Sequence, residues 1–208
     1  MSYSKEYIPA NVLKKIETTW KSELQHQWKQ KARWSDIYRS IDPHIPTNST
    51  ILDLGAGDEH VKSLNKHNGQ YLSIDLNNKC TFQEDLDYNF LDLSLHRGYD
   101  PELNQRVPGD LPWDIGLMVE VMEYLYDPVA VIEHYKQYAT TWIITTRIGR
   151  PNHIYETTHP LQNRYSHWKD FETTLKKHFS DVTVHTIDTT LVTCTGRMKP
   201  FAMALCEV

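Results

Sequence analysis

The sequence predicts an α/β protein built on a mostly parallel β-sheet with helices on both of its faces. Three observations support this prediction. Short apolar segments typical of buried strands recur from residue 51 onward, amphipathic segments lie between several of them, and the first strand runs directly into a glycine-containing turn. Strands that alternate with helices indicate parallel strands joined by helical crossovers.

Seven strands are expected, and the last two have no obvious helix between them. The expected strands cover residues 51–54, 71–75, about 80–86, 115–119, 142–145, 182–187 and 201–208. Helices are expected over residues 128–138 and 168–178. These elements predict a Rossmann-like, doubly wound sheet that ends in an antiparallel hairpin, with the polar, Pro/Gly-punctuated segment 91–112 as a long loop or insertion.

A helical arm over residues 1–47 is predicted ahead of an α/β core over residues 48–208, the whole forming a single domain. Apolar residues recur at helical spacing from about residue 10 to 30. A second, shorter helix carries Trp34, Ile37, Tyr38 and Ile41. The tryptophans of the first helix, Trp20 and Trp28, either pack against the core or belong to a flap that closes over a bound ligand.

Composition favours a cytoplasmic protein. The chain is 39% hydrophobic and 24% charged, no apolar run approaches the roughly 18 residues of a membrane span, and the first residues lack the apolar core of a signal peptide. The three cysteines show no CxxC spacing, which argues against a disulfide framework or a zinc site. A net charge of −5 argues weakly against broad nucleic-acid binding.

The turn after the first strand is the strongest functional signal. A strand that runs straight into Gly55 and Gly57 is typical of a backbone that must approach a ligand closely. Asp75 ends the next strand, at the distance of about 20 residues at which a carboxylate meets the ribose of a bound nucleoside. The turn and the acid together predict nucleoside binding.

Two kinds of nucleoside ligand compete for this turn. A dinucleotide site prefers a third glycine, but this chain has His60 there, and Asp58 and Glu59 stand where a pyrophosphate would approach. Carboxylates repel phosphates. A ligand with a cationic centre and an amino-acid tail suits the turn better, and S-adenosylmethionine is such a ligand.

With these residues, the chain resembles the class I S-adenosylmethionine-dependent methyltransferases. Asp53-x-Gly55-x-Gly57 is similar to their first motif, and Asp75 matches the acid that binds the ribose. Residues 113–128, WDIGLMVEVMEYLYDP, resemble their fourth-strand segment. The resemblance spans roughly residues 48–180 and implies that S-adenosyl-L-methionine is the cofactor.

The chain departs from the family pattern at three places. Glu59 stands where a third glycine is common, Tyr124 stands where many relatives carry histidine, and QYATT replaces the usual glycine-rich turn before the fifth strand. The residues implied to touch the cofactor remain. They are Asp53, Gly55, Ala56, Gly57, Asp75, Leu76, Asp85, Glu120 and Val121, with Asp85 preferred to Asp87 as the contact to adenine.

Methyl transfer requires an acceptor held in line with the methyl group, and a base only where the acceptor must lose a proton. The candidate catalytic residues are His153, His159 and Glu120. Residues 147–167 hold three arginines and three histidines against one acid. Arg147, Arg150 and Arg164 predict recognition of a small anionic acceptor, although an ordinary solvated loop has the same composition.

Other interpretations remain open beside this one. Glu120 and Glu123 with downstream histidines resemble the metal site of some O-methyltransferases, but Tyr124 is a poor ligand at neutral pH, so no metal is expected. The prediction is a methyltransferase acting on an oxygen or nitrogen of a small, anionic molecule. The alternatives are an RNA methyltransferase that uses the basic segment and a non-catalytic, S-adenosylmethionine-binding scaffold.

Overall fold

The computed structural model describes residues 36–57, 59, 61–62, 69–75, 80, 82–83, 112–122, 125, 128–149, 165–192 and 198–208. The helix predicted over residues 10–30, nearly all of the loop predicted over 91–112, and most of the basic segment 147–167 lie outside the described residues.

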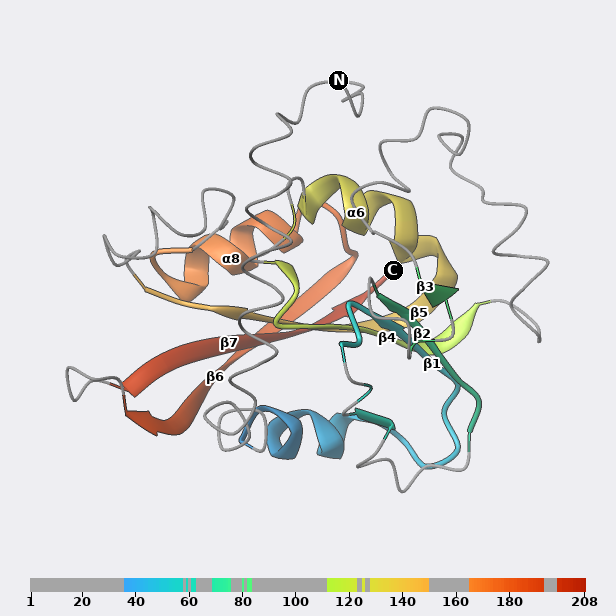
Figure 1. Ribbon diagram of the computed structural model, residues 1–208. Helices are drawn as coiled ribbons and strands as arrows, with labels where there is room; N and C mark the ends of the chain where they lie inside the picture. The colour runs from blue at the N-terminus through green and yellow to red at the C-terminus, as the bar shows by residue number, and fades with distance from the viewer. Residues whose placement is uncertain are drawn as a thin grey trace, which may run out of the picture.

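A seven-stranded sheet forms the centre of the molecule, in the order β3-β2-β1-β4-β5-β7-β6 (Figure 1). Its strands are β1 (Ile51–Leu54), β2 (Tyr71–Asp75), β3 (Phe82–Gln83), β4 (Trp113–Val119), β5 (Ala139–Arg147), β6 (Asp181–Val192) and β7 (Met198–Glu207). The strands β1 to β5 pair in parallel, whereas β7 runs antiparallel to both β5 and β6. The predicted α/β class is confirmed.

The strand order reverses between β1 and β4. From β1 the chain builds β2 and β3 on one side, and it then returns to place β4 on the other side of β1. Open parallel sheets bind ligands outside the carboxyl ends of their strands at such a switch point. A ligand site is therefore expected at the residues that follow β1, β2 and β4.

Helices cover both faces of the sheet, as expected. The described helices are α6 (Pro128–Tyr135), α8 (Trp168–Leu175), a helix over residues 36–41, and the 3-10 helices η2 (Asp42–His44) and η4 (Lys136–Tyr138). Figure 1 shows α6 and α8 on one face and the helix over 36–41 on the other. On the first face Trp142 packs with Phe171 and Tyr135, whereas on the second Ile37 and Ile41 belong to the cluster around Ile51 and Leu117.

Several elements differ from their predicted bounds. The helix expected over 128–138 changes to 3-10 geometry at Lys136, and the helix expected over 168–178 ends at Leu175. The strand expected over 142–145 extends in both directions because Thr141 pairs with β4 and Arg147 pairs with β7. Apolar runs mark the buried centre of a strand, and backbone pairing continues beyond it where the neighbouring strand is long.

Within the described part of the chain, no helix is long and apolar enough to cross a membrane. The cytoplasmic location stays a prediction.

Candidate functional site

The turn after β1 has the conformation that its glycines predict. Gly55 and Gly57 have φ values of 71° and 57°, in the left-handed region that favours glycine. The carbonyl oxygen of Ile74 accepts hydrogen bonds from the backbone N–H groups of Gly55 (2.8 Å) and Ala56 (3.3 Å), so the turn is fixed to β2. A Cβ atom at Gly55 would lie 2.3 Å from Cγ2 of Val121, which shows that the turn also packs against the chain after β4.

Asp75 lies at the end of β2, beside this turn. Its side chain is buried, with 5% of the residue exposed, and its Oδ2 accepts a hydrogen bond from the backbone N–H of Gly57 at 2.9 Å. The thiol of Cys80 donates to the Gly57 carbonyl oxygen at 3.4 Å, and burial raises the pKa of this thiol to about 12. The structure thus brings together the two features that predicted nucleoside binding.

Asp53 lies beneath the turn, on the sheet face that carries Ile51. The residue is 2% exposed, and the hydroxyl of Tyr71 donates a hydrogen bond of 2.5 Å to its Oδ2. Burial raises the pKa of the Asp53 carboxyl to about 7; the hydrogen bond from Tyr71 opposes this rise, and the charges of Asp75 and Glu59 add to it. Asp53 is therefore a carboxyl that ionises much less readily than an exposed aspartate and is partly protonated near neutral pH.

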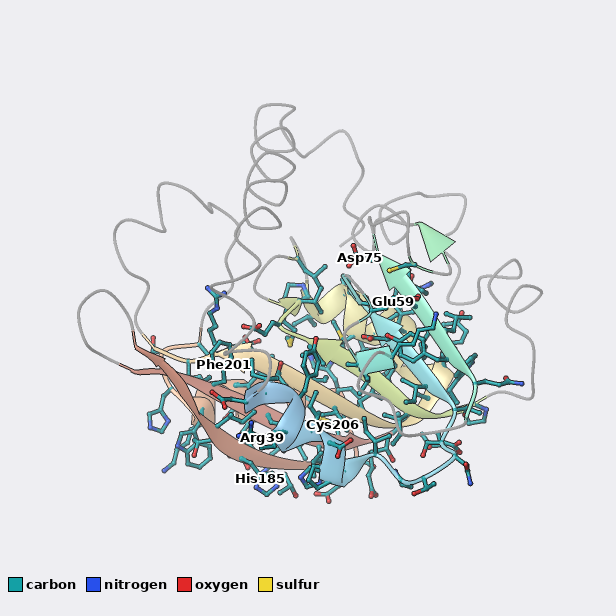
Figure 2. All side chains as sticks on the ribbon, turned by 60° about the horizontal axis from the view of Figure 1, so that its bottom comes forward. Arg39, Glu59, Asp75, His185, Phe201 and Cys206 are labelled. Atoms are coloured by element: carbon teal, nitrogen blue, oxygen red, sulfur yellow. The ribbon has the colours of Figure 1, made fainter. Side chains whose placement is uncertain are left out.

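Glu59 turns toward β2. With a φ of 55°, it accepts a hydrogen bond from the Ser73 hydroxyl at 2.5 Å and from the Lys62 ammonium at 3.0 Å. Figure 2 shows Glu59 and Asp75 near the same end of the sheet. Because Lys62 and Ser73 hold the Glu59 carboxylate, Glu59 would repel a pyrophosphate less strongly than its charge alone predicts.

Glu120 and Arg147 meet at the carboxyl ends of β4 and β5. Both residues are buried, with 7% and 6% exposed, and Arg147 Nε lies 3.7 Å from Glu120 Oε1. The backbone N–H of Glu120 donates to the Thr145 hydroxyl at 2.9 Å. Glu120 has a φ of 55°, an uncommon conformation for a residue other than glycine that tends to occur at functional sites.

Arg147 is buried, whereas an arginine that binds substrate from solvent would be exposed. Its guanidinium carbon lies 6.0 Å from the centre of the Phe201 ring, and a carboxylate neighbours it on the other strand end. An anion that reached Arg147 would therefore meet Glu120 as well. The remaining predicted site residues, Leu76, Asp85, Arg150, His153, His159 and Arg164, lie outside the described residues.

One histidine of the basic segment has a structural role. His167 caps α8: its Nδ1 accepts a hydrogen bond from the backbone N–H of Lys169, and Asp170 Oδ2 accepts one from the backbone N–H of His167, both at 3.2 Å. These reciprocal bonds satisfy helix donors that would otherwise lack partners.

Sequence reasoning missed Tyr71 and Ser73. Both lie on β2 at alternate positions with Asp75, so their side chains share one face of the strand. The alternation of polar with apolar residues in YLSID was the available signal, and it pointed to a polar face beneath the turn.

The carboxyl groups around the turn fit a ligand with a cationic centre and a ribose. Three carboxyl groups, those of Asp53, Glu59 and Asp75, lie near the turn, and the described residues place the Lys62 ammonium against one of them. Carboxylates attract a cation and accept hydrogen bonds from hydroxyl groups. The absence of a Cβ atom at Gly55 makes room for Val121, and both Gly55 and Gly57 adopt the positive φ that glycine tolerates.

Several solved structures with the same architecture are methyltransferases. The 1,6-didemethyltoxoflavin N1-methyltransferase of Burkholderia thailandensis, solved with its substrate and S-adenosylhomocysteine, is 12% identical with a TM-score of 0.64, over 100% of this chain and 92% of that one. A complex of the Haloferax volcanii Trm112 methyltransferase activator with a proposed methyltransferase contains a chain that is 12% identical with a TM-score of 0.61. The match covers 91% of this chain and 96% of that one.

An S-adenosylmethionine-dependent methyltransferase from Thermotoga maritima is 10% identical with a TM-score of 0.59, over 94% of this chain and 99% of that one. The sequence matches no protein-family model and no curated protein. At these identities the similarity concerns the fold. The chain has the fold of the class I S-adenosylmethionine-dependent methyltransferases.

Proposed function

We propose that this protein is an S-adenosylmethionine-dependent methyltransferase that acts on an oxygen or nitrogen of a small, anionic acceptor. The observation that carries the proposal is the meeting of three segments at the switch point of the sheet. The turn at Gly55–Gly57 is hydrogen-bonded to Asp75 and packed against Val121. A fold of this class supports many activities, so the proposal depends on these residues.

In this proposal Asp75 holds the ribose hydroxyls, the turn lies against the amino-acid part of the cofactor, and Glu120 and Val121 border the place where cofactor and acceptor meet. When bound, S-adenosylmethionine supplies a methyl group on a positively charged sulfur, which a nucleophilic oxygen or nitrogen attacks. The work of the protein is to orient the acceptor and exclude water. Leu76 and Asp85 complete the proposed cofactor site.

The acceptor site is proposed after β4 and β5. Its residues are Glu120, His153 and His159 as candidates for proton transfer, and Arg147, Arg150 and Arg164 as candidates for binding the anion. The support is the number of basic residues in the segment that follows β5. The 1,6-didemethyltoxoflavin N1-methyltransferase of similar fold, which was solved with that small molecule bound, also favours a small acceptor over RNA.

Thermal unfolding with added ligands tests the cofactor assignment. A ligand present at about 100 times its dissociation constant stabilises the folded state by roughly 2.7 kcal/mol, and each kcal/mol raises Tm by about 2–4 °C for a domain of this size. S-adenosylmethionine and S-adenosylhomocysteine should therefore raise Tm by roughly 5–11 °C, while NAD at the same concentration should have little effect.

The matched variant is Asp75→Asn, which keeps the shape of the side chain but removes its charge. We expect this variant to reduce the rise in Tm that both adenosyl ligands cause, because it weakens charge-assisted hydrogen bonds to the ribose. A rise in Tm with NAD and with neither adenosyl ligand would contradict the proposal. Binding of S-adenosylmethionine without methyl transfer to any small carboxylate, phosphate or RNA acceptor would favour the non-catalytic scaffold.

A further inference from the structure

The polar face of β2 forms a layer beneath the glycine turn. Tyr71, Ser73 and Asp75 alternate along the strand, and each has a hydrogen-bonding partner in or next to the turn region. Tyr71 donates to Asp53 on the neighbouring strand, Ser73 donates to Glu59, and Asp75 accepts from Gly57. This face of β2 therefore carries Asp75 and provides hydrogen bonds to the other two acidic groups near the turn, Asp53 and Glu59.

Asp53 depends most strongly on this layer. It is nearly inaccessible to solvent, at 2% exposed, so a charge on it is costly unless a neighbouring group stabilises that charge. The hydroxyl of Tyr71, at 2.5 Å from Oδ2, provides a hydrogen bond to the ionised form. Burial and the charge of Asp53 raise the pKa of Tyr71, so the tyrosine remains a donor at any physiological pH.

We propose that Tyr71 is a positioning residue for cofactor binding: its hydrogen bond orients the Asp53 carboxyl and favours its ionised form beneath the turn, where the negative charge attracts a cationic ligand. This inference rests on the proposed function, because the cation it concerns is the sulfonium or ammonium group of S-adenosylmethionine. Tyr71 need not touch the ligand, since it acts through Asp53.

The proposal implies that binding is linked to a proton. A cation bound near a partly protonated carboxyl favours the ionised form. Binding near neutral pH therefore releases part of a proton and becomes tighter as the pH rises toward full ionisation of Asp53. The described titratable groups that face Asp53 and Tyr71 are Tyr38 from the helix over residues 36–41, Glu59 and Lys62 from the segment after β1, Asp75 from β2, and Cys80 after it. From β4, the partner opposite Asp53 is the apolar Leu117.

Carboxyl-carbon NMR of the full chain, without ligand, tests the action of Tyr71 directly. The Asp53 signal is assigned by its loss in Asp53→Asn, and its titration midpoint is followed in the wild-type protein and in Tyr71→Phe. We expect the midpoint to rise by about one pH unit in Tyr71→Phe, because a hydrogen bond to the charged form is removed. The matched control is Tyr38→Phe, which removes a hydroxyl from the helix packed on the same sheet face but leaves the Tyr71 hydroxyl in place, so the midpoint should move by much less than in Tyr71→Phe.

Calorimetry with S-adenosylmethionine tests the consequence for binding. At pH 7 the affinity of Tyr71→Phe should fall by about threefold to tenfold, and the loss should disappear well above both midpoints, since one pH unit corresponds to a tenfold change in protonation. Titrations in two buffers of different ionisation enthalpy should show proton release in the wild-type protein and none in Asp53→Asn.

The outcomes separate this inference from the proposed function. An unchanged Asp53 midpoint in Tyr71→Phe, an equal loss of affinity at every pH, or the absence of proton release by the wild-type protein would each overturn the role of Tyr71. A wild-type protein that binds neither S-adenosylmethionine nor S-adenosylhomocysteine at any pH would instead contradict the proposed function, whatever the NMR midpoints show.

Discussion

At Gly55, both the backbone conformation and the packing require a residue without a side chain. Its φ of 71° and the 2.3 Å that would separate an added Cβ atom from Val121 both exclude a side chain. Glu120, the residue before Val121, has a φ of 55° and is not a glycine. The described site thus combines a glycine that the geometry demands with a glutamate in an uncommon backbone conformation.

We expect Gly55→Ala to lower the free energy of unfolding by about 2–5 kcal/mol. About 1–2 kcal/mol of this comes from the left-handed backbone, and about 1–3 kcal/mol from overpacking against Val121. Urea denaturation of Gly55→Ala, Val121→Ala and the double variant measures the two parts. In the Val121→Ala background the cost of the glycine substitution should fall but stay above the backbone cost, because the Cβ atom of residue 121, 2.7 Å from the added Cβ, remains. An equal cost in both backgrounds would show that the contact with the Cγ atoms of Val121 carries no energy.

The ends of β4 and β5 are joined by the buried ion pair of Glu120 and Arg147. Their side chains are 5% and 7% exposed, respectively, so solvent screens the pair poorly. Loss of one member of a buried pair typically costs about 3–5 kcal/mol, because the other charge is left in a medium of low polarity. The pair thus holds the two strand ends that border the proposed acceptor site.

A double-mutant cycle tests this link between the strands. We expect Glu120→Gln and Arg147→Met to destabilise the protein more in sum than the double variant does, with a coupling of about 1–3 kcal/mol. Urea denaturation of the four proteins gives the coupling, and changes that add within about 0.5 kcal/mol would exclude a direct interaction.

The molecule buries apolar side chains on both faces of its sheet, and the two clusters depend on different parts of the chain. The cluster under α6 and α8 comes from residues 52–206, whereas the opposite cluster takes Ile37 and Ile41 from the segment before β1. The helix over residues 36–41 therefore belongs to the core that supports β1 and β4, the two strands on either side of the switch point.

We expect Ile41→Ala to lower the free energy of unfolding of the whole protein by about 2–5 kcal/mol, and Tm by at least about 4 °C. Ile41 is 1% exposed. The matched control on the same helix is Arg39→Ala, whose side chain is 77% exposed and whose removal should change stability by less than about 0.5 kcal/mol. Figure 2 labels Arg39 on this helix. Equal melting temperatures for the two variants would show that this helix unfolds independently of the sheet.

Local sequence was sufficient to predict the strands that are marked by their own residues. The strands Ile51–Leu54 and Tyr71–Asp75 have their predicted bounds, because each is a short apolar run that ends at a breaker or an acid. The positive φ of Gly55 and Gly57 followed from the same few residues. These properties depend on backbone geometry and on the alternation of side chains along a strand, which neighbours in sequence determine.

Tertiary structure decided which side chains meet. Tyr71 reaches Asp53, Glu59 turns back to Ser73, and Arg147 neighbours Glu120, although these partners are separated by 18, 14 and 27 residues along the chain. Sequence alone indicated an acidic turn and an anion-binding arginine, because it records the charge of a residue but not its partner. By itself the sequence determined the α/β fold and the turn; burial and parallel strand pairing, which join distant segments, decided the electrostatics of the candidate site.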